Sequence, residues 1–170
     1  LLPRADSAFG IGLYSRRPLR DVVLVPDARG IPAVGATLDV QGHPVRLIAV
    51  PPMPPVAPAE HAARDRMLAA LAAGHHPALG GAPGLPLLVA GDLNATPWSS
   101  ALRQAAGGRL RRTTGFGATW PMSWGGYLGI PIDHVLASAE WRVVDARRGP
   151  HIGSDHAPIL IELRLDESAR

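Results

Sequence analysis

The chain has 170 residues, of which 46% are hydrophobic, a formal net charge of +3 and no cysteine. These values predict one folded domain over residues 1–170, and they exclude a disordered tail, a disulfide framework and a cysteine nucleophile. No apolar run approaches the roughly 18 residues of a membrane-spanning helix, and the first ten residues lack the pattern of a signal peptide.

The first elements in the chain are short strands. Residues 11–15 and 22–25 each predict a strand. Residues 33–40 and 45–50 predict a β-hairpin, because the glycine-containing segment between them fits a turn. The proline-rich residues 51–58 exclude a helix and predict a stiff connecting loop, with a ligand for a proline-binding module as the alternative.

Two helices and a buried strand follow. Residues 59–74 predict a helix that Gly74 ends in the left-handed region. The continuous apolar run in residues 85–94 predicts a strand buried on both faces. Thr96 and Pro97 predict the N-cap and the first residue of a second helix. Further strands are predicted at residues 132–138, 140–148 and 157–165.

This order of elements predicts an α+β fold. Strands outnumber helices, and they do not alternate with helices as in a regular series of βαβ units. We therefore expect packed sheets with helices on the outside.

Three polar signals interrupt the apolar framework, each beside a predicted strand where a loop begins or ends. They are Asp92 with Asn94 in "GDLNATP", Asp133 in "PIDHVLAS", and Asp155 with His156 in "GSDHAPI". A carboxylate at such a place loses solvation unless a metal, a histidine or a hydrogen-bond donor meets it. Each motif alone also fits a simple turn, because Asp and Asn are common turn residues.

Taken together, the three signals favour phosphate-ester hydrolysis. Residues two apart on an extended segment share a face, so Asp92 and Asn94 can address one substrate. A carboxylate such as Asp133 can fix the tautomer of a histidine. The side chains of Asp155 and His156 point to different sides, so one can hold a cation while the other reaches an anion.

The residues of these motifs and their order along the chain resemble those of the endonuclease/exonuclease/phosphatase superfamily. "ATWP" and "IPIDHVL" add to the resemblance, as does the early segment "FGIGLYSRRPL", so it spans Phe9 to Leu163. It implies a deoxyribonuclease-I-like, four-layer α/β/β/α sandwich, with two packed and mainly antiparallel sheets flanked by helices. It also implies hydrolysis of a phosphate ester by direct attack of water.

The resemblance implies a role for each matching residue around that water. Asp92 would position or deprotonate the attacking water, and Asn94 would hold the same water or the scissile phosphate. Asp133 would orient His156, which would stabilise the charge that develops on a phosphoryl oxygen.

The resemblance also implies a cation and a substrate contact. Asp155 would help to bind a divalent cation, Mg²⁺ or alternatively Mn²⁺, since both accept oxygen ligands. Thr119 and Trp120 match a family segment near the substrate, and His134 receives no catalytic role. The basic balance favours an anionic substrate, which is a nucleic acid, a phospholipid headgroup or a small phosphate ester.

Two departures from the family pattern leave a second interpretation open. The family's early Asn and metal-binding Glu lie upstream of the segment where this chain begins, so we expect the later two-thirds of the fold with its first strands missing. Pro51 stands where relatives carry a histidine, for which His61 is a candidate replacement. The alternative is therefore a catalytically impaired phosphate-binding or interaction domain on the same scaffold.

Oligomeric state and compartment are expectations only. We expect a monomer. Some bacterial relatives lie outside the cell on N-terminal membrane helices, which favours an extracytoplasmic location over a cytoplasmic one.

Overall fold

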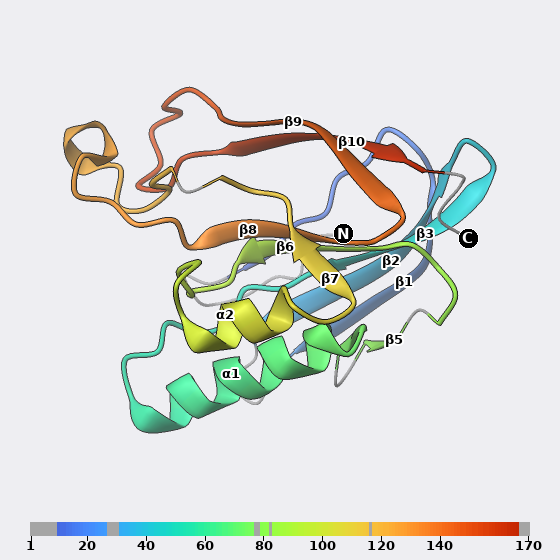
Figure 1. Cartoon of the computed structure of the whole chain (residues 1–170), viewed down its shortest axis with the longest axis horizontal. Helices are drawn as coiled ribbons and strands as arrows, with labels where there is room; N and C mark the ends of the chain where they lie inside the picture. Colours follow the sequence, from blue (N-terminus) through green and yellow to red (C-terminus); the bar gives the residue numbers. More distant parts are fainter. Residues whose placement is uncertain (1–9, 27–30, 77–78, 82, 116, 167–170) are drawn as a thin grey trace.

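The computed structural model describes residues 10–26, 31–76, 79–81, 83–115 and 117–166. Its centre is a six-stranded mixed sheet in the order β1-β2-β3-β6-β8-β7 (Figure 1). The strands of this sheet are β1 (Leu19–Pro26), β2 (Pro32–Val40), β3 (His43–Ala49), β6 (Leu87–Asp92), β7 (Leu110–Arg112) and β8 (Asp133–Ser138).

The predicted hairpin is confirmed as β2 and β3, which pair in antiparallel register. Its loop is only Gln41 and Gly42, with φ of 57° and 86°. Two consecutive positive φ values match the twist of a tight hairpin, and glycine adopts them without steric cost. His43 and Pro44, expected in the turn, instead pair with Val40 and Asp39.

Helix α1 (Pro58–Ala72) carries the chain from β3 to β6, which is parallel to β3. Gly74 follows the helix with φ of 80°, as the sequence predicted. Helix α2 (Ser100–Ala105) begins later than predicted. The reason is that the Ser99 hydroxyl, not that of Thr96, accepts the capping hydrogen bond, from the Leu102 backbone N–H at 3.3 Å.

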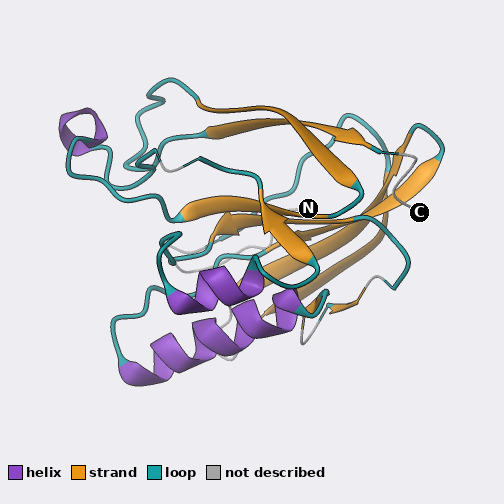
Figure 2. Cartoon of the chain, in the orientation of Figure 1, coloured by secondary structure: helices purple, strands orange, loops and turns teal. Residues whose placement is uncertain are grey.

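The molecule is layered around the large sheet. Helices α1 and α2 cover one face, and the antiparallel ribbon of β9 (Trp141–Arg148) and β10 (Ile159–Leu165) lies over the other (Figures 1 and 2). The two short strands β4 (His75–His76) and β5 (Gly80–Gly81) pair with each other, and η1 (Ser123–Gly126) is a single 3-10 turn. Two packed sheets with helices outside confirm the predicted α+β class.

Alternating side chains of the central strands supply two cores. Ile48, Val89 and Leu136 face the helices and pack with Leu68 and Leu102. On the opposite face a smaller cluster contains Val45, Ala137 and Trp141, with Leu88 and Leu163 packed against it. Strand β6 contributes to both clusters, which confirms that it is buried on both faces. No helix in the described ranges is long and apolar enough to cross a membrane.

One predicted strand is wrong, and one observed strand was not predicted. Residues 11–15 form no strand, because no strand of the described chain pairs with them and the backbone bends at Arg16 and Arg17, where the Arg17 N–H donates to the Ser15 hydroxyl at 3.0 Å. Strand β7 was not predicted, since three residues between glycine-rich turns give no periodic pattern. Phe9, where the family resemblance begins, lies outside the described residues.

Candidate active site

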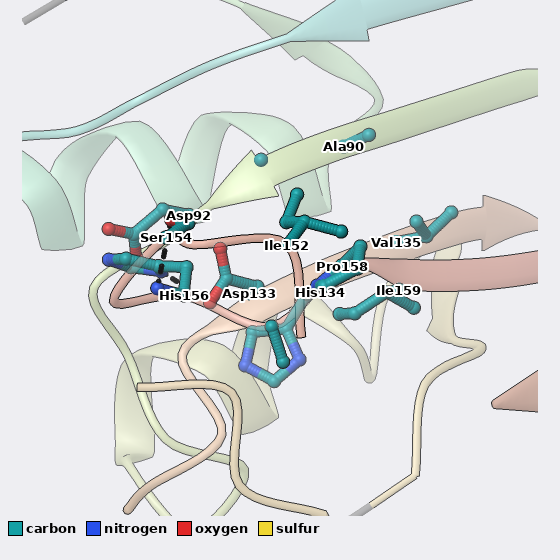
Figure 3. A pocket seen from close by; sticks show the side chains of 12 residues that line it. Ala90, Asp92, Asp133, His134, Val135, Ile152, Ser154, His156, Pro158 and Ile159 are labelled. Atoms are coloured by element: carbon teal, nitrogen blue, oxygen red, sulfur yellow. Dashed lines mark hydrogen bonds and ion pairs between the residues drawn. The ribbon is translucent and has the colours of Figure 1, made fainter. Parts of the chain in front are cut away.

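The site lies where β6 ends and β8 begins. These strands are antiparallel, and their register places Asp92 directly opposite Asp133. Both side chains project to the face of the sheet that the ribbon covers, where they line a cavity of about 320 Å³ together with His156, Ser154 and apolar residues of β6, β8 and β10 (Figure 3). The fold therefore brings together two carboxylates separated by 41 positions in the sequence.

A glycine fixes how the strand approaches this point. Gly91 has φ of 154°, and a Cβ added there would lie 2.0 Å from the carbonyl oxygen of Val50. Real Cβ atoms do not approach a backbone oxygen so closely, so only glycine fits. The end of β6 is thereby pressed against the end of β3 immediately before Asp92.

Asn94 turns back onto Asp92. Its φ of 46° lies in the left-handed region, which Asn tolerates better than most residues. Its backbone N–H donates to Asp92 Oδ1 at 2.9 Å, and its amide nitrogen donates to Asp92 Oδ2 at 3.3 Å and to the Pro52 carbonyl at 2.8 Å. The two residues meet through a turn and not through the extended geometry that the sequence suggested. The Asn94 amide nitrogen is engaged by protein, which leaves Oδ1 as the atom that can accept from water.

The pKa of the Asp92 carboxyl group lies above its ordinary value. Its pKa is raised to about 6, chiefly by burial and also by the neighbouring Asp133 carboxylate, while the hydrogen bonds from Asn94 and the His156 ring oppose the rise. A carboxylate with a pKa close to neutral pH is well suited to accept a proton from water.

His156 and Asp133 form the second part of the site. His156 Nδ1 lies 2.9 Å from Asp133 Oδ2, and both side chains are partly buried. The His156 backbone N–H also donates to the Ser154 hydroxyl at 3.1 Å, which fixes the loop that carries the ring. With Nδ1 held by the carboxylate, Nε2 is the ring nitrogen that can reach a ligand.

Asp155 and Trp120 border the site. The Trp120 indole N–H donates to Asp155 Oδ2 at 3.1 Å, and the Trp120 and His156 rings lie 6.2 Å apart between centroids. The side chains of Asp155 and His156 therefore make contacts in different directions, with Trp120 and Asp133 respectively.

Thr119 is buried beside the start of β8. It is 4% exposed, and its hydroxyl accepts from the backbone N–H groups of Ile132 at 3.0 Å and Asp133 at 3.2 Å. Thr119 thus supports the backbone at the start of β8, and its contact with a substrate stays a prediction.

The two other histidines near these motifs are occupied. His134 is 1% exposed, with Nε2 donating to the Ala95 carbonyl at 2.8 Å and Nδ1 3.0 Å from the Thr114 hydroxyl, and burial lowers its pKa. It is a neutral structural link between β8 and the segments that carry Ala95 and Thr114. His61 contacts Arg64 and Asp65 through its two ring nitrogens and does not line the cavity, so it does not replace the missing histidine.

The described residues do not by themselves complete a metal site. Among them no group of three or more Asp, Glu or His side chains is arranged to hold a metal ion. A cation held with the help of Asp155 would therefore need further ligands, and Mg²⁺ takes six, several of them waters or substrate oxygens.

The model of the endonuclease/exonuclease/phosphatase family matches residues 2–156. The chain belongs to this family. The match contains all seven residues named above as site candidates, from Asp92 to His156. No curated protein sequence matches the chain.

Solved structures share the fold of this family member. One is an endonuclease/exonuclease/phosphatase from Beutenbergia cavernae, with 22% identity and a TM-score of 0.70 over 89% of this chain and 46% of that one. A second is a 3′ phosphatase from Neisseria bound to a product DNA hairpin, with 20% identity and a TM-score of 0.65 over 88% of this chain and 73% of that one. A third is the catalytic domain of human Nocturnin with bound sulfate, with 16% identity and a TM-score of 0.63 over 88% of this chain and 60% of that one. The chain thus spans about half of the first of these structures.

Two contributors to the site have no motif in the sequence. They are the Pro52 carbonyl, which binds Asn94, and Arg64 on α1, whose guanidinium donates to the Asn94 carbonyl at 2.7 Å. No sequence signal marks Arg64, because a charged residue on a helix normally predicts a solvated surface.

Proposed function

We propose that this chain carries the catalytic residues of a phosphoesterase that hydrolyses its substrate by direct attack of water. The observation behind the proposal is the convergence of Asp92, Asp133 and His156 on one cavity, with Asp133 bonded to His156. Membership of a family of endonucleases, exonucleases and phosphatases supports the same reaction class.

The geometry suggests how the chain's own residues divide the chemistry. Asp92, as the carboxylate, accepts a proton from the water whose oxygen bonds to phosphorus. His156, protonated and held by Asp133, donates from Nε2 to a phosphoryl oxygen and stabilises its growing charge. The P–O ester bond then breaks, and the leaving oxygen takes the electron pair of that bond and a proton from solvent.

A divalent cation belongs to the proposal, with Mg²⁺ preferred and Mn²⁺ as the alternative. When bound, such an ion neutralises charge on phosphate oxygens. Asp155 is our candidate for one of its ligands. Because the described residues do not complete a metal site, the steps above involve only protein side chains and solvent.

The proposed substrates are phosphate esters of nucleic acid or of a small molecule. The Neisseria structure is a phosphatase with DNA, and the Nocturnin domain holds sulfate, an anion of similar shape to phosphate. The net charge of +3 favours the same anionic class.

The experiment is hydrolysis by the purified protein, with and without Mg²⁺ or Mn²⁺ and after chelation. The substrates are bis-p-nitrophenyl phosphate, p-nitrophenyl phosphate, plasmid DNA and a 3′-phosphorylated oligonucleotide. We expect Asp92→Asn and His156→Ala to lower the rate by about 10²-fold or more. Glu162→Gln, an exposed carboxylate on β10, is the control and should keep the activity. Equal rates for all variants would refute the proposed function.

The incomplete metal site favours one rival, a phosphate-binding domain without turnover. Such a domain would bind inorganic phosphate in a calorimetric titration, would lose that binding in His156→Ala, and would hydrolyse none of the four substrates.

A further inference from the structure

A buried arginine binds the turn by which Asn94 folds back onto Asp92. Arg64 on α1 is 7% exposed, and α1 covers the face of the sheet opposite the cavity (Figure 1). Its Nη1 donates to the Asn94 carbonyl at 2.7 Å, while Nε and Nη2 donate to Asp65 Oδ1 at 2.9 and 2.7 Å. His61 completes the group, 3.1 Å from Arg64 Nη2 and 3.3 Å from Asp65 Oδ2.

The contact from Arg64 holds Asn94, whose backbone is strained, on the side away from Asp92. Asn94 has a positive φ, and its backbone N–H and side chain already bind Asp92 and Pro52. The Arg64 bond secures the remaining polar group of the Asn94 backbone, its carbonyl. A charge-assisted bond from a planar guanidinium sets both distance and direction, which an ammonium does less well.

Arg64 affects Asp92 through geometry and not through a direct effect of its charge. The adjacent Asp65 carboxylate neutralises the guanidinium, and the charged groups that act on Asp92 are Asp133 and His156. A loss of Arg64 would therefore reach Asp92 through the Asn94 hydrogen bonds.

We infer that Arg64 is a positioning residue: by holding the Asn94 carbonyl it keeps Asn94 hydrogen-bonded to Asp92 in the geometry that hydrolysis requires. Its effect on rate rests on the proposed function, but its effect on the Asp92 carboxylate does not.

The test compares two equally buried arginines. Arg46 is also 7% exposed, and its guanidinium donates to the carbonyls of Asp21 at 3.1 Å and Leu79 at 3.5 Å, away from the site. Both Arg64→Met and Arg46→Met should lower the melting temperature. Only Arg64→Met should lower kcat, by about tenfold, with KM changed less than twofold, because displacing a catalytic group slows the reaction more than it weakens binding.

The pH profile separates positioning from simple loss of stability. The Asn94 hydrogen bonds lower the pKa of Asp92, so releasing Asn94 should raise it and move the acid limb of the kcat/KM profile to higher pH. The limb should stay in place for Arg46→Met. Where Arg64→Met does not fold, Arg64→Lys serves instead, since it keeps the charge and the stem but only one donor group, and it should give a smaller effect of the same sign.

A measurement without substrate decides the inference independently. The ¹³C resonance of the Asp92 carboxyl carbon, followed by NMR against pH, should report a higher pKa in Arg64→Met or Arg64→Lys than in the unmodified protein and in Arg46→Met. An unchanged Asp92 pKa, or an equal fall in kcat for Arg46→Met, would overturn the role of Arg64. A protein that hydrolyses nothing but shows the NMR shift would refute the proposed function and uphold the positioning role.

Discussion

Replacing Asp92 by Asn should abolish activity and stabilise the fold above pH 6. Burial raises the pKa of Asp92 from 3.8 to about 6. Each pKa unit corresponds to about 1.4 kcal/mol, so keeping this carboxylate ionised in the folded protein costs up to about 3 kcal/mol. Because Asp92 borders a cavity open to solvent and Asn lacks the second acceptor that the Asn94 amide uses, we expect a net gain of about 1–2 kcal/mol.

The sign of this effect depends on pH. A carboxyl group whose pKa is higher in the folded state contributes stability that is fully present below pH 3.8 and is lost as the pH rises through 6. Asn has no such titration. The variant and the unmodified protein should therefore have similar free energies of unfolding near pH 4 and should differ most at pH 7 to 8.

Urea unfolding at pH 4, 6 and 8 measures the stability, and initial rates of hydrolysis across the same range measure the activity. For the unmodified protein the rate should fall about tenfold between pH 7 and pH 5, as Asp92 takes up its proton. An Asp92→Asn variant that is less stable than the unmodified protein at pH 8, or a rate that is flat through pH 6, would refute both the high pKa and its assignment to the catalytic base.

Three further predictions concern neighbouring groups. Asp133→Asn should lower kcat/KM by about 10- to 100-fold, and adding it to His156→Ala should cost little more, because the two residues act as one unit; steady-state kinetics of the single and double variants measures this. His134→Ala should reduce the free energy of unfolding in urea by about 2–4 kcal/mol while the folded fraction stays active, since it removes a buried link. Gly91→Ala should prevent stable folding, judged by circular dichroism, because its Cβ has no room.

Much of the fold was predictable because its main elements carry strong local patterns. The β2–β3 hairpin, α1 and β6 follow from turn residues, helix formers and a continuous apolar run. The start of α2 was not, since Thr96 and Ser99 are both good capping residues and only tertiary packing decides between them. The strand prediction for residues 11–15 failed for a related reason: a strand needs a neighbouring strand to pair with, and strand propensity alone does not supply one.

The site was predictable only as a set of residue types. Motifs placed Asp92, Asp133 and His156 at strand ends, and the structure shows that the register of β6 and β8 makes the two carboxylates opposite partners. The predicted reason for the contact of Asn94 with Asp92 was wrong, because an Asn alone does not reveal a left-handed turn. The role of Arg64 could not be predicted for a different reason. Its contact joins a helix to a loop 30 positions away, and no periodic pattern in the sequence indicates such a contact.

The backbone around Asp92 explains why these contacts occur together. A carboxylate with a raised pKa gains solvation from any rearrangement that lets it turn toward water, so its position is not stable unless the chain on both sides is fixed. Gly91 fixes the preceding residue by close approach to Val50, and Asn94 fixes the following turn through bonds that Arg64 supports. Conformations that most residues avoid therefore flank the one group whose reactivity depends on staying partly buried. Releasing the Asn94 flank should consequently displace the carboxylate and, because the Asn94 hydrogen bonds lower its pKa, raise that pKa and leave less of the group ionised at neutral pH.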